Sequence, residues 1–147
     1  MRRVALIYNP ASGQHPERRD AVIAEVVSVL RRAAVEVRVI PTESPASAGS
    51  QAYAAMEEGC DTILVCGGDG TVHESLQQLV GGKAALGVIP MGTANALATD
   101  LGLPGSPIRA VKKLLGRCST KTAKARHARD TLLWRREWER TRCLWGG

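Results

Sequence analysis

Apolar and polar positions follow two alternating patterns along the first 116 residues. Short continuous apolar runs predict buried strands, and longer stretches with apolar residues every three or four positions predict helices. The expected strands are residues 4–8, 36–40, 62–66 and 86–89. The expected helices begin near Pro16 and after Pro45, and then cover 72–80, 97–101 and 108–115.

Strands that alternate with helices of this length indicate parallel βαβ units. The continuous apolar character of the strands supports this, because parallel strands are buried on both faces. We therefore expect an α/β fold in three layers, with a mostly parallel sheet and helices on both faces. Its predicted extent is residues 1–116, and residues 117–147 form a separate tail.

Composition agrees with one domain of this kind. The chain has 147 residues, 44% of them hydrophobic, and it contains no Phe. The core is therefore expected to be aliphatic. No segment approaches the roughly 20 apolar residues that span a bilayer, so we expect a soluble, cytoplasmic protein.

Cysteine and histidine give no sign of a metal site. There is no C-x-x-C pair, and the histidines are scattered, so zinc spacing is missing and reduced thiols are expected. The residues concerned are Cys60, Cys66, Cys118, Cys143, His15, His73 and His127.

The net charge of +6 is confined to the tail. Residues 117–147 hold 9 of the 20 basic and 3 of the 14 acidic residues, which leaves 11 of each in residues 1–116. The predicted domain therefore has no electrostatic footprint for a nucleic acid.

The tail also departs from the domain in its aromatic content. All three tryptophans fall in the last 14 residues. A basic, Trp-bearing helix on a membrane surface is one interpretation, and an unstructured basic tail is a second. The third is a truncated or frame-shifted sequence, which other frames of the coding DNA would test.

Three predicted strands run into glycine-containing segments that open helices: Asn9–Gly13, Gly67–Thr71 and Met91–Asn95. Parallel strands end at one edge of a sheet, where ligands bind, so the segments should converge. Glycine lets a backbone approach a ligand, and N–H groups at helix starts bind anions. Hydroxyl and amide side chains in the segments suit phosphate and ribose, so together they predict a nucleotide pocket.

Each segment alone has a structural alternative. Thr71-x-x-Glu74 matches a capping box, Thr93 could be an N-cap, and Ser12-Gly13 could be an ordinary turn. Neither G-x-x-x-x-G-K-[ST] nor G-x-G-x-x-G is present, which excludes the two common phosphate fingerprints.

Asp69 is the acidic residue inside the second segment. Phosphates repel a carboxylate unless it holds Mg²⁺, directly or through water, or accepts a proton from an attacking hydroxyl. The alternative is an Asx turn, in which Asp69 bonds nearby backbone N–H groups.

The three segments together resemble the catalytic domain of the diacylglycerol kinase and sphingosine kinase family, which is related to the NAD kinases. The resemblance covers roughly residues 3–116. It rests on N-P-x-S-G at 9–13, G-G-D-G-T-V-x-E at 67–74, G-V-I-P-x-G-T-A-N at 87–95 and L-G-L-P at 101–104.

The resemblance implies ATP-dependent, Mg²⁺-assisted phosphorylation of a lipid hydroxyl. Asp69 would be the catalytic base or the carboxylate linked to Mg²⁺, and Glu74 would support the residues that touch the nucleotide. The implied nucleotide-binding residues are Asn9, Ser12, Gly13, Gly67, Gly68, Gly70, Thr71, Gly92, Thr93 and Asn95.

The chain also departs from the family. Ala96 stands where an acidic residue is common, and His73 stands where Asn is common. From the resemblance we expect that the family's second, β-rich domain is absent, so the expected function is a lipid kinase that is incomplete in this chain. The expected partners are nucleotide and lipid, with peripheral membrane contact and without nucleic acid. The alternatives are an NAD kinase-like phosphotransferase and a non-catalytic ATP-binding remnant.

Overall fold

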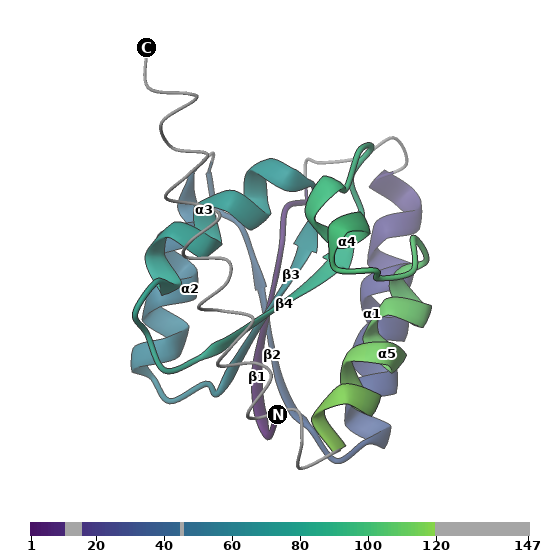
Figure 1. Ribbon diagram of the computed structural model, residues 1–147, viewed down its shortest axis with the longest axis horizontal. Helices are drawn as coiled ribbons and strands as arrows, with labels where there is room; N and C mark the ends of the chain where they lie inside the picture. Colours follow the sequence, from purple (N-terminus) through teal and green to yellow (C-terminus); the bar gives the residue numbers. More distant parts are fainter. Residues whose placement is uncertain (11–15, 45, 120–147) are drawn as a thin grey trace. The chain divides into compact units, whose positions relative to one another are not determined.

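The computed structural model describes residues 1–10, 16–44 and 46–119 (Figure 1). The chain divides into two units, Met1–Leu115 and Gly116–Gly147, and the sheet belongs to the first. The predicted tail lies outside the described residues, apart from the end of the last helix. The elements in chain order are β1 (Arg3–Tyr8), α1 (Pro16–Arg32), β2 (Glu36–Pro41), α2 (Ser47–Glu57), β3 (Thr62–Gly67), α3 (Asp69–Leu79), β4 (Ala85–Pro90), α4 (Ala96–Asp100) and α5 (Pro107–Ser119).

The four strands form one parallel sheet in the order β2-β1-β3-β4. Leu6 pairs with Val39 on one side and with Leu64 on the other. This confirms the predicted α/β fold, because each strand is followed by a helix that returns the chain to the same end of the sheet.

Helices cover both faces of the sheet, and alternate strand residues enter two separate cores. Ala5 and Ile7 pack in a cluster with residues of α2 and α3. Val4 and Leu6 pack in a second cluster with residues of α1 and α5. In Figure 1, α2 and α3 accordingly lie on one side of the sheet, and α1 and α5 lie on the other. The layers are the three that the hydrophobic pattern predicts.

Helix α3 is held against α2 by close backbone packing at Gly49. A Cβ on Gly49 would lie 2.8 Å from the carbonyl oxygen of Glu74, so a larger residue would push the helices apart. Ala48 and Ala52 are buried on the same helix. These small side chains let α3 lie close to α2, which fixes the helix that begins with Asp69.

The strand order creates a switch point between β1 and β3. The chain leaves β1 through α1 on one face of the sheet, and it leaves β3 through α3 on the opposite face. The two connections therefore diverge between these neighbouring strands. In open α/β sheets, ligands bind in the crevice outside the strand ends at such a point.

Candidate functional site

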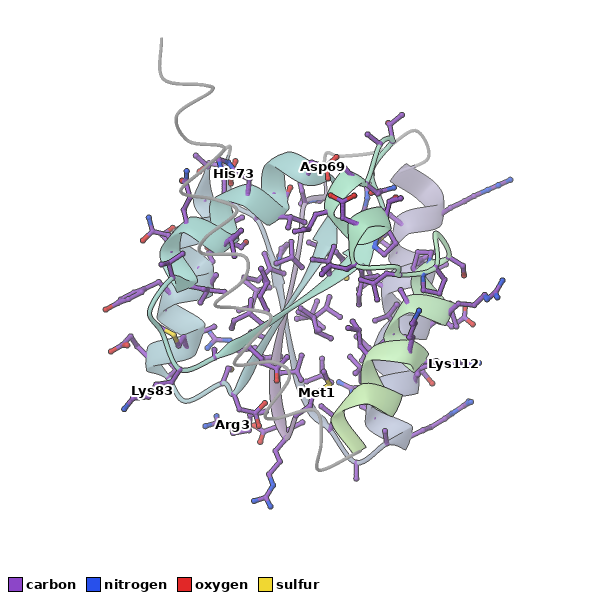
Figure 2. The ribbon with its side chains drawn as sticks, viewed as in Figure 1. Met1, Arg3, Asp69, His73, Lys83 and Lys112 are labelled. Atoms are coloured by element: carbon purple, nitrogen blue, oxygen red, sulfur yellow. The ribbon has the colours of Figure 1, made fainter. Side chains whose placement is uncertain are left out.

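The candidate site lies at the carboxyl ends of β1, β3 and β4. Figure 2 shows Asp69 at this end of the sheet, and Met1 and Arg3 at the opposite end. The site end gathers three predicted segments, of which the structure describes Asn9–Pro10, Gly67–Thr71 and Met91–Asn95. Ser12 and Gly13 lie outside the described residues.

The second segment is a strand-to-helix junction with almost no loop. Strand β3 ends at Gly67, α3 begins at Asp69, and the extended N-cap Gly68 is the only residue between them. The first helical bond runs from the Val72 N–H to the Gly68 carbonyl at 3.2 Å. The backbone N–H groups of the first turn consequently have no helical acceptor, and the N-cap residue Gly68 has no side chain to cap them.

The predicted capping box is therefore wrong. The helix begins two residues before Thr71, because Gly68 takes the extended N-cap conformation and Asp69 opens the first turn. An acidic residue is favourable there, since it faces the positive end of the helix dipole. Thr71 and Glu74 lie inside α3, and the uncapped N–H groups can bind an anion.

The glycines of this junction have different surroundings. A Cβ on Gly67 would stand 3.1 Å from the hydroxyl oxygen of Thr71, which places the Thr71 side chain against the end of β3. A Cβ on Gly70 would meet nothing within 4 Å. Gly70 therefore leaves open space beside the first turn of α3, where a ligand could approach the backbone.

Asp69 is exposed and is tied to α4, which directly follows the third segment. Its Oδ1 accepts a hydrogen bond from the Leu97 N–H at 3.3 Å, across 28 residues of sequence. This bond connects α3 to the first turn of α4 rather than to the turn that contains Asp69. Among the hydrogen bonds of the described residues, Asp69 therefore forms no Asx turn.

Asn95 shapes the third segment from within. Its Oδ1 accepts the Gly92 N–H at 2.9 Å, and its Nδ2 donates to the Gly92 carbonyl at 2.7 Å. Asn95 is also the N-cap of α4, with φ 51° and ψ 43° in the left-handed region. Thr93 is therefore not the N-cap, and it lies exposed two residues earlier.

The second and third segments meet backbone against backbone. The Met91 N–H donates to the Gly67 carbonyl at 3.2 Å, which extends the ladder between β3 and β4. A Cβ on Gly92 would collide with the Gly68 Cα and would stand 3.1 Å from the Gly68 nitrogen. Glycine is therefore required at position 92, where the two segments approach without room for a side chain, whereas a Cβ on Gly68 would stand 3.4 Å from the Gly92 Cα.

The first segment brings in Arg19, a residue that the sequence analysis does not single out. Arg19 lies in the first turn of α1 and is only 6% exposed. Its guanidinium donates to the carbonyl oxygen of Pro10, directly after Asn9. The hydrophobic pattern does not single out Arg19. Two neighbouring arginines in the first turn of a helix are usually expected on the surface.

The side chains of the site suit Mg²⁺ that is bound together with substrate phosphates better than a metal ion that protein side chains bind alone. Within the described residues there is no group of three His, Cys, Asp or Glu side chains that could hold a metal ion. Mg²⁺ is commonly bound by one or two carboxylates together with substrate phosphates and water. Asp69 is suited to that arrangement because it is exposed beside the uncapped start of α3.

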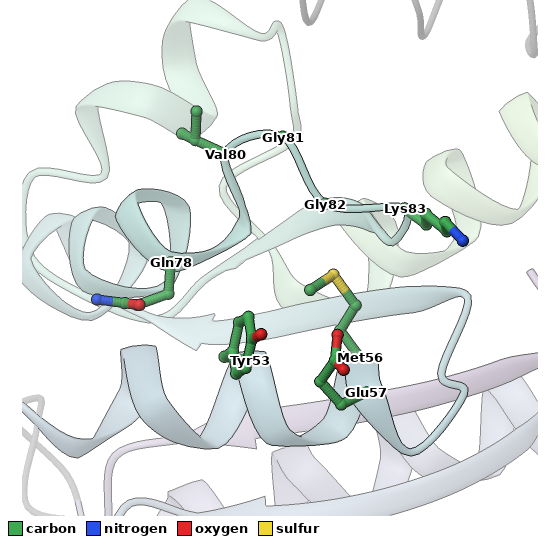
Figure 3. Close-up of a pocket in the computed structure, with 8 residues that line it drawn as sticks. All are labelled: Tyr53, Met56, Glu57, Gln78, Val80, Gly81, Gly82 and Lys83. Atoms are coloured by element: carbon green, nitrogen blue, oxygen red, sulfur yellow. The ribbon is translucent and has the colours of Figure 1, made fainter.

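A pocket of about 490 Å³ lies elsewhere on the fold (Figure 3). It is formed by α2, the end of α3 and the turn before β4, and it contains none of the predicted site residues. Its lining residues are Tyr53, Met56, Glu57, Gln78, Val80, Gly81, Gly82 and Lys83. The turn precedes β4, so this pocket lies toward the amino ends of the strands and away from Asp69.

Comparisons with known proteins agree with this geometry. The family model of the diacylglycerol kinase catalytic domain matches residues 3–127. A diacylglycerol kinase of Staphylococcus aureus is 33% identical over 122 residues, and one of Staphylococcus saprophyticus is 31% identical over 116. These matches cover 82% and 78% of this chain, but 38% and 37% of the two relatives.

A solved structure gives the same result for the fold. The crystal structure of a diacylglycerol kinase from Bacillus anthracis matches with a TM-score of 0.70 and 29% identity, over 78% of this chain and 43% of that one. The chain thus spans less than half the length of each of these three diacylglycerol kinases. It belongs to the diacylglycerol kinase catalytic domain family.

Proposed function

We propose that the chain is the nucleotide-binding part of an ATP-dependent lipid kinase. The observation that carries the proposal is the crossing of Gly68 and Gly92 beside the uncapped start of α3, with the Asp69 carboxylate exposed next to it. The diacylglycerol kinases among the relatives support a lipid alcohol as acceptor, and diacylglycerol is the one we propose.

In this proposal the phosphates of ATP bind at the β3–α3 junction. The N–H groups of Asp69, Gly70 and Thr71 supply donors, and the helix dipole adds a favourable field for negative charge. The open space beside Gly70 admits a phosphate to the backbone. The Thr71 hydroxyl, set against Gly67, offers a further donor. Asn9 and Thr93 complete the nucleotide site from the neighbouring strand ends.

Asp69 is proposed to serve the acceptor or the metal. As a base it would take the proton of the lipid hydroxyl while that oxygen forms a bond to the γ-phosphorus and ADP leaves. Alternatively it would hold Mg²⁺, which when bound neutralises charge on the phosphate chain. The Leu97 N–H fixes one carboxylate oxygen, so the other is oriented for either role.

Glu74 and Asn95 are proposed to support these residues. Glu74 is half-buried one turn after Gly70, and its backbone lies against Gly49 of α2. The Asn95 amide uses hydrogen bonds to both backbone groups of Gly92, which holds the third segment against Gly68. This loop-shaping role adds to the nucleotide contact that the family resemblance implies for Asn95.

Access to a lipid acceptor requires contact with a membrane surface. Of the described helices, none has the length and apolar character needed to cross a bilayer. We therefore propose peripheral contact from the cytoplasmic side. Sedimentation with liposomes that contain diacylglycerol tests this directly, and protein that stays in the supernatant at low salt would contradict it.

A transfer assay tests the proposed function. The chain is incubated with ATP labelled at the γ-phosphate, Mg²⁺ and either diacylglycerol vesicles or NAD. Label in the lipid is expected, and label only in NAD would replace the lipid kinase with an NAD kinase. Calorimetry with ATP and Mg²⁺ separates two further outcomes: binding without transfer indicates a non-catalytic remnant, and the absence of binding rejects the proposal.

A further inference from the structure

Arg19 is a buried cation that joins the first turn of α1 to the end of β1. Only 6% of the residue is exposed, and its Nη1 donates to the carbonyl oxygen of Pro10. Pro10 follows Asn9 at the carboxyl end of β1, beside the switch point with β3. Arg19 therefore bonds the strand end whose residues are predicted to bind nucleotide.

The position of Arg19 is electrostatically unfavourable for the fold alone. The first turn of a helix carries the positive end of the dipole, which disfavours a cation. Guanidinium remains protonated, and burying its charge costs free energy unless polar partners compensate. Of the contacts that Arg19 makes with the described residues, the bond to the Pro10 carbonyl supplies only a partial negative charge. An anion bound at the adjacent strand end would offset both unfavourable effects.

Arg19 also supplies positive charge that the three glycine-containing segments lack. None of Asn9–Gly13, Gly67–Thr71 and Met91–Asn95 contains Lys or Arg, although a nucleotide triphosphate carries several negative charges. Side chains of a helix lean toward its N-terminus. From the fourth position of α1, Arg19 can therefore reach back to the strand end and bring positive charge to it.

We infer that Arg19 is a positioning residue for the phosphate chain of the nucleotide. Its bond to Pro10 holds the end of β1 in the conformation that receives the phosphates, and its charge favours their binding. The inference rests on the proposed function, because it assumes that a phosphorylated nucleotide binds at this end of the sheet.

Calorimetry on the full chain with ATP and with adenosine, each with Mg²⁺, tests the inference. Arg19→Met is expected to weaken ATP binding by about tenfold or more, the effect of losing a bond to a charged group. Adenosine affinity is expected to stay unchanged. The matched control is Arg18→Met, which removes the same charge from an exposed neighbour in the same turn. Its effect on ATP should be no more than about twofold.

The outcomes separate the inference from the function on which it rests. If the wild type does not bind ATP, the proposed function fails and the inference fails with it. If the wild type binds ATP and Arg19→Met binds it equally well, the inference alone fails. Equal losses for ATP and adenosine would also overturn it, because they indicate a general distortion of the site.

Two further variants keep the test decisive if Arg19→Met does not fold. Arg19→Lys and Arg19→Gln each retain a donor for the Pro10 carbonyl, but only Lys retains the charge. Their thermal unfolding is measured first to show that both fold. The lysine variant is then expected to bind ATP more tightly than the glutamine variant, and equal affinities would contradict the inference.

Discussion

The two ends of the parallel sheet each carry an aspartate, and the two carboxylates are used differently. At the amino end, Asp61 accepts the Arg2 N–H at 2.7 Å and the Thr62 hydroxyl at 2.7 Å, and it lies 3.8 Å from the N-terminal ammonium. At the carboxyl end, Asp69 accepts one N–H at 3.3 Å. Asp61 accepts from several donors although its side chain is 41% exposed, whereas Asp69 accepts from one donor among the described residues.

The difference appears in the chemistry of Asp61. Partial burial raises the pKa of Asp61. The opposing effect is larger and brings this pKa below 3.8, because the carboxylate accepts from the Thr62 hydroxyl and the N–H groups of Arg2 and Arg3 and lies near the N-terminal ammonium. The charged form is thus stabilised by the fold. The two carboxylates thus differ in their number of donors, and we propose that Asp61 serves stability while Asp69, at the start of α3, serves function.

The largest expected effect is on catalysis at the carboxyl end. In a form of the protein that transfers phosphate, Asp69→Asn is expected to lower kcat by at least about 100-fold, the scale of acid–base groups. The initial rate of label transfer to diacylglycerol measures it. Asp100→Asn, an exposed carboxylate on α4, is the control and should retain activity. Near-normal activity of Asp69→Asn would contradict the proposed catalytic role of Asp69.

The second-largest effect is expected on stability, where Gly92 packs against Gly68 at the carboxyl end of the sheet. Gly92→Ala is expected to reduce the free energy of unfolding by about 1–3 kcal/mol, because the new Cβ meets the Gly68 backbone and no flexible side chain can yield. Urea unfolding measures the change. Gly105→Ala is the matched control, since a Cβ there meets nothing within 4 Å. A stable Gly92→Ala variant would show that the crossing is looser than described.

Variants of Asn95 test whether this residue mainly shapes the third segment or mainly contacts the nucleotide. Asn95→Ala is expected to cost about 1–2 kcal/mol of stability, since it loses two hydrogen bonds and leaves a Cβ-bearing residue at φ 51°. Asn95→Gly should cost less, because glycine accepts that conformation. Urea unfolding ranks them. Unchanged stability with weakened ATP binding would instead make Asn95 chiefly a nucleotide ligand.

The smallest effect concerns the amino end. Asp61→Asn is expected to lower stability at pH 7 by about 1 kcal/mol or less, because the group is partly exposed and screened by solvent. The pKa of Asp61 is lowered on folding, so its contribution is present above the unfolded value of 3.8 and is lost as pH falls through the folded value. The difference between variant and wild type should therefore shrink in acid.

Unfolding curves from pH 7 down to pH 3 measure this dependence. Glu25→Gln, an exposed carboxylate in the middle of α1, is the control. ATP binding by Asp61→Asn at pH 7 should equal that of the wild type. A loss of ATP binding without a loss of stability would mean that the two ends are not separate in function.

The sequence predicts the sheet and its helices well because burial imposes a period on the chain. Val4 and Leu6 enter one core and Ala5 and Ile7 the other, so the apolar run of β1 directly reports a strand covered on both faces. The start of α3 is less well predicted. Thr71 and Glu74 have capping-box spacing, but the extended Gly68 allows the helix to begin at Asp69.

The sequence pattern does not predict contacts between distant segments. The crossing of Gly68 and Gly92 and the Asp69–Leu97 bond join residues more than 20 positions apart, and neither depends on hydrophobic period. The bond from Arg19 to Pro10 hides a buried cation among charges that look exposed. The predicted site residues at the strand ends remain predictions of a nucleotide site until a ligand is tested.

Backbone amide chemical shifts measured during titration with ATP and Mg²⁺ test the central claim most directly. The account predicts that the amides of Gly68, Gly70, Thr71 and Gly92 shift strongly, while those of Arg2, Arg3 and Thr62 at the other end of the sheet do not. Shifts confined to the amino end, or to the pocket around Tyr53 and Lys83, would contradict the account.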